Sequence, residues 1–218
     1  MTYKKSFRCF LLHSILFFHI PAFSESILFA QNTFDLRALN DFLFTSSDTS
    51  SETQNDSKYS RSKFGHGWKD FDRDCQNSRH ETLIAQSLSS VAFKTYKNCK
   101  VVSGEWNSPF SNERIFLASK IDIDHVVPLK WAWERGAINW SKTKRVNFAN
   151  DPNNLLAVEA RLNRQKGAKG PYNWLPPKNK CSYLKTFSEI VDTYDLQYRE
   201  DEQGYIDSLK IKYCQYVK

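Results

Sequence analysis

The stretch Ile-Asp-His-Val-Val-Pro-Leu occupies residues 123–129 of a chain of 218 residues. Together with Ile121 and Asp122, it alternates side chains with the period of a β-strand, which Pro128 ends. The Asp-His pair that this strand carries, Asp124 with His125, is the first indication of a functional site.

A second strand and a helix follow farther along the chain. The apolar run at residues 155–158 predicts a short strand, and residues 160–166 have a helical pattern that stops at Gly167. Between the two strands, Ser141 is placed to cap another helix. The order strand, excursion, strand, helix predicts an α+β domain over residues 59–218.

The N-terminal region predicts export. Basic residues precede an apolar run at residues 9–20, so we predict a signal peptide at residues 1–24. A membrane anchor is the alternative, but this run of about a dozen residues falls short of the roughly 20 that span a bilayer. Residues 25–58 are acidic and rich in Ser and Thr, which predicts a leader and flexible linker. We expect a periplasmic or extracellular protein that does not associate with membranes after signal removal.

Four cysteines remain after the predicted signal is removed: Cys75, Cys99, Cys181 and Cys214. An even number in an oxidising compartment predicts two disulfides. Three pairings are possible, and the shorter loops favour Cys75–Cys99 with Cys181–Cys214. No two of these cysteines have the Cys-x-x-Cys spacing of a zinc knuckle, which makes a zinc site less favoured.

Charge is distributed unevenly along the chain. The net charge is +7, yet residues 25–57 hold six acidic side chains against one basic side chain, Arg37. The remainder is therefore more basic than the whole, which suits a polyanionic partner such as nucleic acid. Many solvated surfaces are also basic, so charge alone does not decide the function.

Residues 124–166 offer the groups that phosphodiester hydrolysis requires, namely a base, a metal site and orienting groups. His125 is the predicted base, because a neutral imidazole accepts a proton near pH 7. Asp124 and Asn163 are the predicted metal ligands, since oxygen donors suit Mg²⁺ or Mn²⁺ better than Zn²⁺. Asn154, just before the second strand, is predicted to orient the His125 ring.

Basic residues near these groups are predicted to contact phosphates. Lys166 lies three residues after Asn163 and hence on the same helix face, from which it could reach a phosphate. Further candidates are Arg161, Arg164, Lys169 and Arg79. For Arg79, a salt bridge on a helix surface is an equally good explanation.

Three segments carry a family resemblance: Ile-Asp-His-Val-Val-Pro-Leu (123–129), Phe-Ala-Asn-Asp-Pro-Asn-Asn-Leu-Leu-Ala-Val (148–158) and Asn-Arg-Gln-Lys-Gly (163–167). Together they resemble the HNH endonuclease family, particularly its small secreted bacterial branch. The Asp-His pair and the nine-residue step from Asn154 to Asn163 also resemble the HNH domain of RNA-guided CRISPR nucleases. The resemblance covers roughly residues 59–196.

This resemblance implies a ββα-metal finger within a small disulfide-containing domain. It also implies an endonuclease that cuts DNA, or alternatively RNA. We expect little sequence specificity, because no base-reading module is visible in the sequence, and we expect a monomer. Carried over by position, the family pattern makes His125 the general base, Asp124 and Asn163 the metal ligands, and Asn154 the orienting residue. Asp and Asn replace two histidines of the usual pattern, which favours Mg²⁺ or Mn²⁺ over Zn²⁺.

One geometric difficulty follows from the strand itself. Adjacent residues of an ideal strand point to opposite faces, so a bend before Pro128 is needed to bring Asp124 and His125 to one metal. Two other functions stay open. A nucleic-acid-binding protein could keep this fold without cleaving, although it would have no use for a general base. A secreted interaction protein could be merely basic and disulfide-stabilised.

Overall fold

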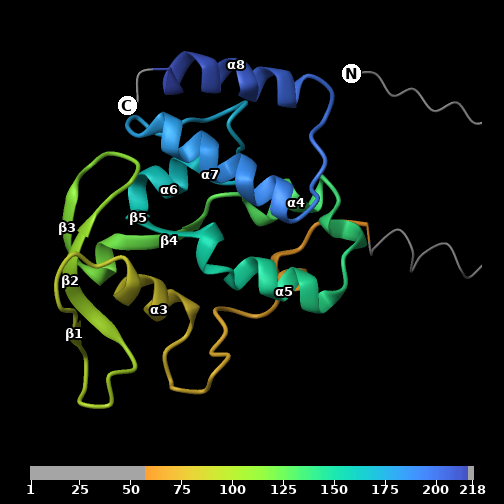
Figure 1. Ribbon diagram of the computed structural model, residues 1–218. Coiled ribbons are helices and arrows are strands. Elements are labelled where there is room, and N and C mark those ends of the chain that lie inside the picture. Colours follow the sequence, from red (N-terminus) through yellow and green to blue (C-terminus); the bar gives the residue numbers. More distant parts are fainter. Residues whose placement is uncertain (1–56, 216–218) are drawn as a thin grey trace, which may run out of the picture. The chain divides into compact units, whose positions relative to one another are not determined.

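The computed structural model describes residues 57–215. The predicted signal peptide and nearly all of the leader lie outside these residues. Within them, the chain forms two small antiparallel sheets and a set of α-helices packed around them (Figure 1), which confirms the α+β class. None of the helices within residues 57–215 combines the length and apolar character that crossing a membrane requires.

The first sheet has three strands, β1 (Ala92–Phe93), β2 (Val101–Asn107) and β3 (Arg114–Leu117), in that order. Its strand pairing shifts register between Ser103 and Trp106. The Trp106 indole is buried and donates a hydrogen bond of 2.8 Å to the carbonyl of Leu83 in α3 (Ser78–Ala85). This sheet is therefore anchored on α3.

The second sheet consists of β4 (Ile121–His125) and β5 (Leu155–Glu159). They pair antiparallel in an unbroken register, from Ile121 opposite Glu159 to His125 opposite Leu155. Helix α6 (Ala160–Lys166) follows β5 without a loop and packs against both strands. It ends where the sequence predicts, at Gly167, whose positive φ of 55° suits glycine.

The excursion between β4 and β5 contains α4 (Leu129–Trp133) and α5 (Lys142–Asn150). Ser141 caps α5 as predicted, since its side chain accepts a hydrogen bond from the Lys144 amide. Helix α3 is capped by Asn77, whose side chain accepts a hydrogen bond from the His80 amide, while the Ser78 hydroxyl donates to the Lys69 carbonyl.

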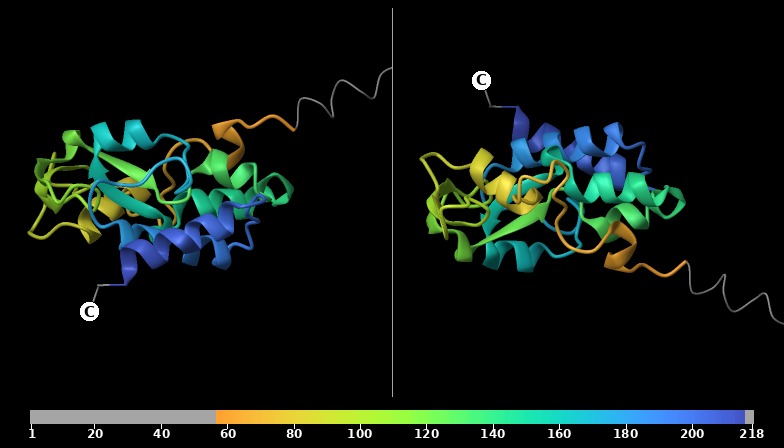
Figure 2. Two further views of the ribbon diagram at one scale, coloured as in Figure 1. Left: turned by 90° about the horizontal axis from the view of Figure 1, so that it is seen from above. Right: turned by 90° about the horizontal axis from the view of Figure 1, so that it is seen from below.

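Two antiparallel helices, α7 (Lys180–Thr193) and α8 (Glu202–Cys214), cover the side of the domain opposite α3 (Figure 2). The disulfide Cys181–Cys214 links them, and Cys75–Cys99 ties the segment before α3 to the loop between β1 and β2. Both pairings are those that the loop lengths favour, so the predicted connectivity is confirmed.

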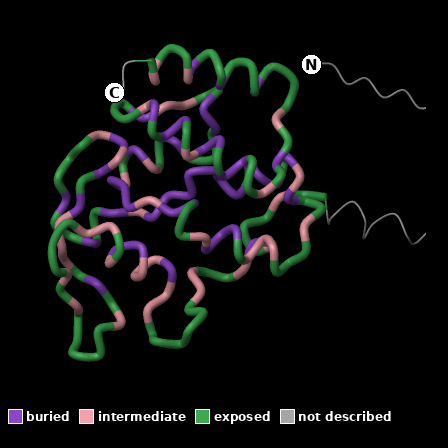
Figure 3. The backbone as a smooth tube through the Cα atoms, viewed as in Figure 1, coloured by how far each residue is buried: buried purple, intermediate pink, exposed green. Residues whose placement is uncertain are grey.

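The buried residues, coloured purple along the backbone in Figure 3, form two clusters, and β4 together with the residue that follows it contributes to both. Ile121 and Ile123 pack with Leu83 and Trp106 beneath the first sheet, whereas Val126, directly after β4, enters the larger cluster of α4, α5 and α7. Burial on both sides holds the strand that carries the predicted site firmly in place.

Candidate functional site

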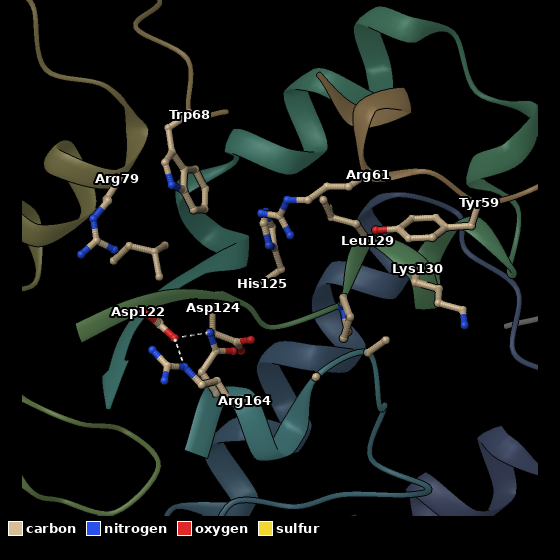
Figure 4. Close-up of a pocket in the computed structure, with 15 residues that line it drawn as sticks. Tyr59, Arg61, Trp68, Arg79, Asp122, Asp124, His125, Leu129, Lys130 and Arg164 are labelled. Carbon is tan, nitrogen blue, oxygen red and sulfur yellow. Dashed lines mark hydrogen bonds and ion pairs between the residues drawn. The ribbon is translucent and has the colours of Figure 1, made fainter. Parts of the chain in front are cut away.

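A cavity of about 460 Å³ opens beside β4 (Figure 4). It brings together the three side chains that the sequence predicts for base and metal chemistry, namely Asp124, His125 and Asn163. Other charged or aromatic side chains also border it: Tyr59, Arg61, Trp68, Arg79, Asp122, Lys130 and Arg164. The cavity therefore joins acidic, basic and aromatic groups from β4, α3, α4, α6 and the segment that precedes α3.

His125 is fixed on two sides. Its Nε2 atom lies 2.9 Å from the Ala149 carbonyl at the end of α5, and a carbonyl can only accept a hydrogen bond. The Trp68 indole stacks on the imidazole with ring centroids 5.4 Å apart and planes inclined by 16°. In the neutral ring, Nε2 therefore carries the proton and Nδ1 is the unprotonated nitrogen.

Burial lowers the pKa of His125 to about 3. The hydrogen bond to Ala149 raises this pKa in part, while the positive charges of Arg61 and Lys166 lower it further. The imidazole is consequently neutral near pH 7, which is the form that a general base requires.

Asp124 and Lys166 form a buried ion pair between β4 and α6. The Lys166 Nζ atom lies 2.9 Å from each Asp124 carboxylate oxygen and 2.7 Å from the His125 carbonyl. The two side chains are 4% and 0% exposed. Lys166 does share a helix face with Asn163, as predicted, but its ammonium lies inside the protein, because it neutralises Asp124. The Lys166 ammonium is therefore not exposed to a phosphate, as the predicted contact would require.

Asn154 is fully buried and binds the chain directly after His125. Its Oδ1 atom accepts a hydrogen bond of 2.8 Å from the Val127 amide, and its Nδ2 atom donates to the Val127 carbonyl at 3.3 Å. Within residues 57–215, Asn154 makes no hydrogen bond to the imidazole. Any effect of Asn154 on the orientation of the ring therefore acts through the backbone.

Asn163 contacts Asp122, an aspartate that is not among the predicted site residues. Its Nδ2 atom lies 3.3 Å from Oδ2 of Asp122, a side chain that is 33% exposed. The alternation in Ile-Asp-Ile-Asp-His was an available signal, because residues two apart on a strand share a face. Asp122 and Asp124 thus both face α6.

The neighbours Asp124 and His125 contact different parts of the molecule. Asp124 faces α6, whereas the His125 ring lies against Trp68 and the end of α5 (Figure 4). The pairing of β4 with β5 stays regular through His125, and the chain bends only after the strand, at Val126 and Val127, the place before Pro128 where a bend was predicted. Both side chains nevertheless border the same cavity.

The remaining basic candidates differ in exposure. The Arg79 guanidinium is half-buried and donates to the carbonyls of Ala118 and Ile121, so part of it has a structural role. The Arg164 side chain is 78% exposed and borders the cavity. Arg161 and Lys169 are exposed outside it. Arg61 and Trp68 were missed, because only the folded chain brings them next to His125.

The oxygen donors of the cavity fit a hard divalent cation. Among the described residues, the donors beside the cavity are the carboxylates of Asp122 and Asp124 and the amide of Asn163, and no cysteine borders it. His125 has its Nε2 atom committed to Ala149. Carboxylate and amide oxygens suit Mg²⁺ or Mn²⁺ better than Zn²⁺.

Comparison with known proteins gives one family and one relative. Residues 79–206 match the family described as the C-terminal domain of GmrSD restriction endonucleases. An uncharacterized secreted protein of Arthroderma benhamiae is 37% identical over 155 residues, which cover 69% of this chain and 74% of the relative. No solved structure matches. Neither match bears on the bacterial branch suggested by the motifs.

Proposed function

The chain belongs to the family of the C-terminal domain of GmrSD restriction endonucleases, and from this premise we propose that it hydrolyses phosphodiester bonds in nucleic acid. We propose DNA as the favoured substrate, His125 as the general base and a divalent metal ion as the cofactor. β4, β5 and α6 correspond in this proposal to the ββα-metal finger of HNH nucleases. The family match supports a nuclease, and the cavity supports the particular chemistry.

The environment of His125 is the observation that carries the proposal. A buried imidazole held in one tautomer by Ala149 and covered by Trp68 stays neutral near pH 7. In this proposal its unprotonated Nδ1 atom accepts the proton of an attacking water molecule. A protein that only bound nucleic acid would gain nothing from this arrangement.

The neighbouring residues have distinct proposed roles. Asn163, with an aspartate of β4, would hold the divalent ion, which when bound offsets negative charge on the phosphate and the leaving oxygen. Arg164, Arg79 and Arg61 border the cavity and provide positive charge for the phosphate. Asn154 holds Val127 and Lys166 holds the His125 carbonyl, so both position the base through the backbone.

Substrate selection is proposed to be loose. Phosphate contacts carry no sequence information, and the basic side chains that border the cavity, Arg61, Arg79, Lys130 and Arg164, suit a phosphate backbone. DNA is favoured over RNA because the matching family is described as a domain of restriction endonucleases.

Secretion is part of the proposal. The two disulfides suit an oxidising compartment, and the Arthroderma benhamiae relative is described as secreted. A signal peptide at residues 1–24 would supply the export signal.

Nicking of supercoiled plasmid tests the role of the base. His125→Ala is expected to nick at least about a hundredfold more slowly than wild type, because general-base catalysis contributes about 10²–10⁴ in rate. Its affinity for DNA should stay near normal. His66→Ala is the matched control, since His66 is exposed and lies outside the cavity. A folded His125→Ala that nicks at the wild-type rate contradicts the proposal.

Metal dependence is tested in the same assay. Mg²⁺ or Mn²⁺ should support more activity than Zn²⁺, because the available donors are oxygens. Full activity in excess EDTA would rule out the proposed chemistry. DNA binding without nicking under every metal condition would instead favour the alternative, a secreted nucleic-acid-binding protein on the same fold.

A further inference from the structure

We infer that Asp122, together with Asn163, holds the divalent ion, and that Asp124 serves as the counter-ion of Lys166. The inference rests on the proposed function and changes the ligand set that the sequence pattern implies. It follows from the different contacts of two aspartates that share one face of β4.

Asp124 is already neutralised. Its two oxygens and the His125 carbonyl are three acceptors for the three hydrogens of the Lys166 ammonium, at 2.9, 2.9 and 2.7 Å. A divalent ion about 2 Å from an Asp124 oxygen would lie within about 5 Å of Nζ. Two cations so close in a buried place repel each other strongly. Lys166 cannot turn away into water without leaving the core, because it is 0% exposed.

Asp122 has the opposite character. Its side chain is one third exposed and borders the cavity, so an ion from solvent can reach it. Two arginines act on it without a hydrogen bond: Arg164, with Nε 3.8 Å from Oδ2, and Arg79, which interacts with it electrostatically while donating to the Ala118 and Ile121 carbonyls. Because the Arg164 side chain is 78% exposed, it is free to move toward a phosphate.

The spacing between Asp122 and Asn163 suits two ligands of one ion. Rotating the Asn163 amide by 180° exchanges Nδ2 for Oδ1 and places an oxygen beside the Asp122 carboxylate. Adjacent oxygens of an octahedral Mg²⁺ site, each about 2.1 Å from the ion, are about 3 Å apart. The observed distance from Asn163 Nδ2 to Asp122 Oδ2 is 3.3 Å. Only a small adjustment separates this pair from the geometry of two neighbouring ligands.

Mn²⁺ binding followed by electron paramagnetic resonance separates the two aspartates without relying on activity. The full chain is titrated in the His125→Ala background with a DNA duplex, which stays uncut, and wild type is titrated without duplex. Asp122→Ala should weaken Mn²⁺ binding at least about tenfold, since even residues that only support a ligand cost 10- to 100-fold. Its melting temperature should stay near wild type, because Asp122 is partly exposed.

The matched control removes the ion pair as a unit. Asp124→Leu/Lys166→Met deletes both charges with side chains of similar size and should bind Mn²⁺ within about threefold of its parent. A loss as large as that of Asp122→Ala, or unchanged binding by Asp122→Ala, overturns the inference. A parent protein that binds no Mn²⁺ would also overturn the inference. If the double variant does not fold, the affinity and melting temperature of Asp122→Ala decide alone. Failure of the proposed function would appear separately, as wild-type protein that does not nick plasmid.

Discussion

Among residues 57–215, two ion pairs are buried, one beside the cavity and one remote from it. The site pair, Lys166 with Asp124, joins α6 to β4, and the helix pair, Arg135 with Glu202, joins the end of α4 to the start of α8. Every side chain in these pairs is at most 10% exposed. The two pairs differ in how well their surroundings support the charges.

The helix pair is well supported. Arg135 donates from Nε to Glu202 at 2.7 Å and from a second nitrogen to the other carboxylate oxygen, and its guanidinium lies 4.1 Å above the Trp131 ring. Burial raises the pKa of Glu202, but the hydrogen bonds from Arg135 and from the Arg199 amide outweigh it and leave this pKa below the usual value. The ionised form of Glu202 is therefore favoured in the folded protein.

The site pair is less favourable. Burial raises the pKa of Asp124 and lowers the pKa of Lys166, and their mutual attraction offsets only part of either shift. Perturbed ionisable groups of this kind cluster at functional sites. The difference indicates that the helix pair serves stability, whereas the site pair holds the strand end that carries His125 at some cost in stability.

Breaking the site pair should have the largest effect on folding. Lys166→Met leaves the buried Asp124 carboxylate without a partner and should destabilise the protein by about 3–5 kcal/mol. Urea denaturation with the disulfides intact measures this. Asp124→Leu/Lys166→Met should recover most of the loss, because no charge is left unpaired. Equal stability of Lys166→Met and wild type would show that the pair contributes nothing.

Breaking the helix pair should lower the free energy of unfolding and leave the rate of DNA nicking unchanged. Glu202→Gln removes a charge but keeps polar atoms beside Arg135, so a loss of about 1–3 kcal/mol is expected. Plasmid nicking at 25 °C should stay within about twofold of wild type, since the reacting groups lie on other elements. A nicking rate that falls more than tenfold while the protein remains folded would erase the distinction between the two pairs.

The sequence predicts those parts of the site that depend on local pattern. The strand around His125, the helix ending at Gly167 and both disulfides follow from alternation, a helix stop signal and loop length. The motif spacing also agrees with the gathering of Asp124, His125 and Asn163 at one cavity.

What the sequence could not predict depends on distant contacts. Trp68 covers His125 from a segment more than fifty residues earlier, and no local pattern indicates that contact. Lys166 was expected at the surface, because lysine is almost never fully buried unless it is paired. Its pairing with Asp124 requires α6 to lie against β4, which only the three-dimensional structure shows.

Acid should destabilise the protein through His125. Its pKa is about 3 in the folded chain and near 6.5 in the unfolded chain, so the unfolded state binds the extra proton between these values. The contribution of the neutral ring is complete above pH 6.5 and decreases as pH falls toward 3. Between pH 6.5 and 5 this amounts to roughly 1–2 kcal/mol.

His125→Gln isolates this term, because glutamine does not titrate. Its free energy of unfolding should decrease less than that of wild type between pH 6.5 and 5, as measured by urea denaturation at each pH. Parallel pH profiles for the two proteins would mean that His125 is protonated as easily in the folded chain as in the unfolded chain.

The smallest expected effect concerns which basic side chains contact DNA. Arg164 is 78% exposed at the cavity, so Arg164→Ala should weaken DNA binding a few-fold and lower the salt slope of the affinity by about one unit, equally for all sequences. Lys210→Ala on α8 is the control for loss of a charge outside the cavity.

Lys166→Met should leave the salt slope of DNA affinity unchanged, because a buried ammonium paired with Asp124 releases no counterion from DNA. The slope is measured under conditions in which the variant is folded. If the salt slope of DNA affinity is lower in Lys166→Met than in Arg164→Ala, then Lys166 leaves Asp124 when DNA binds. Lys166 would in that case contact a phosphate in the complex.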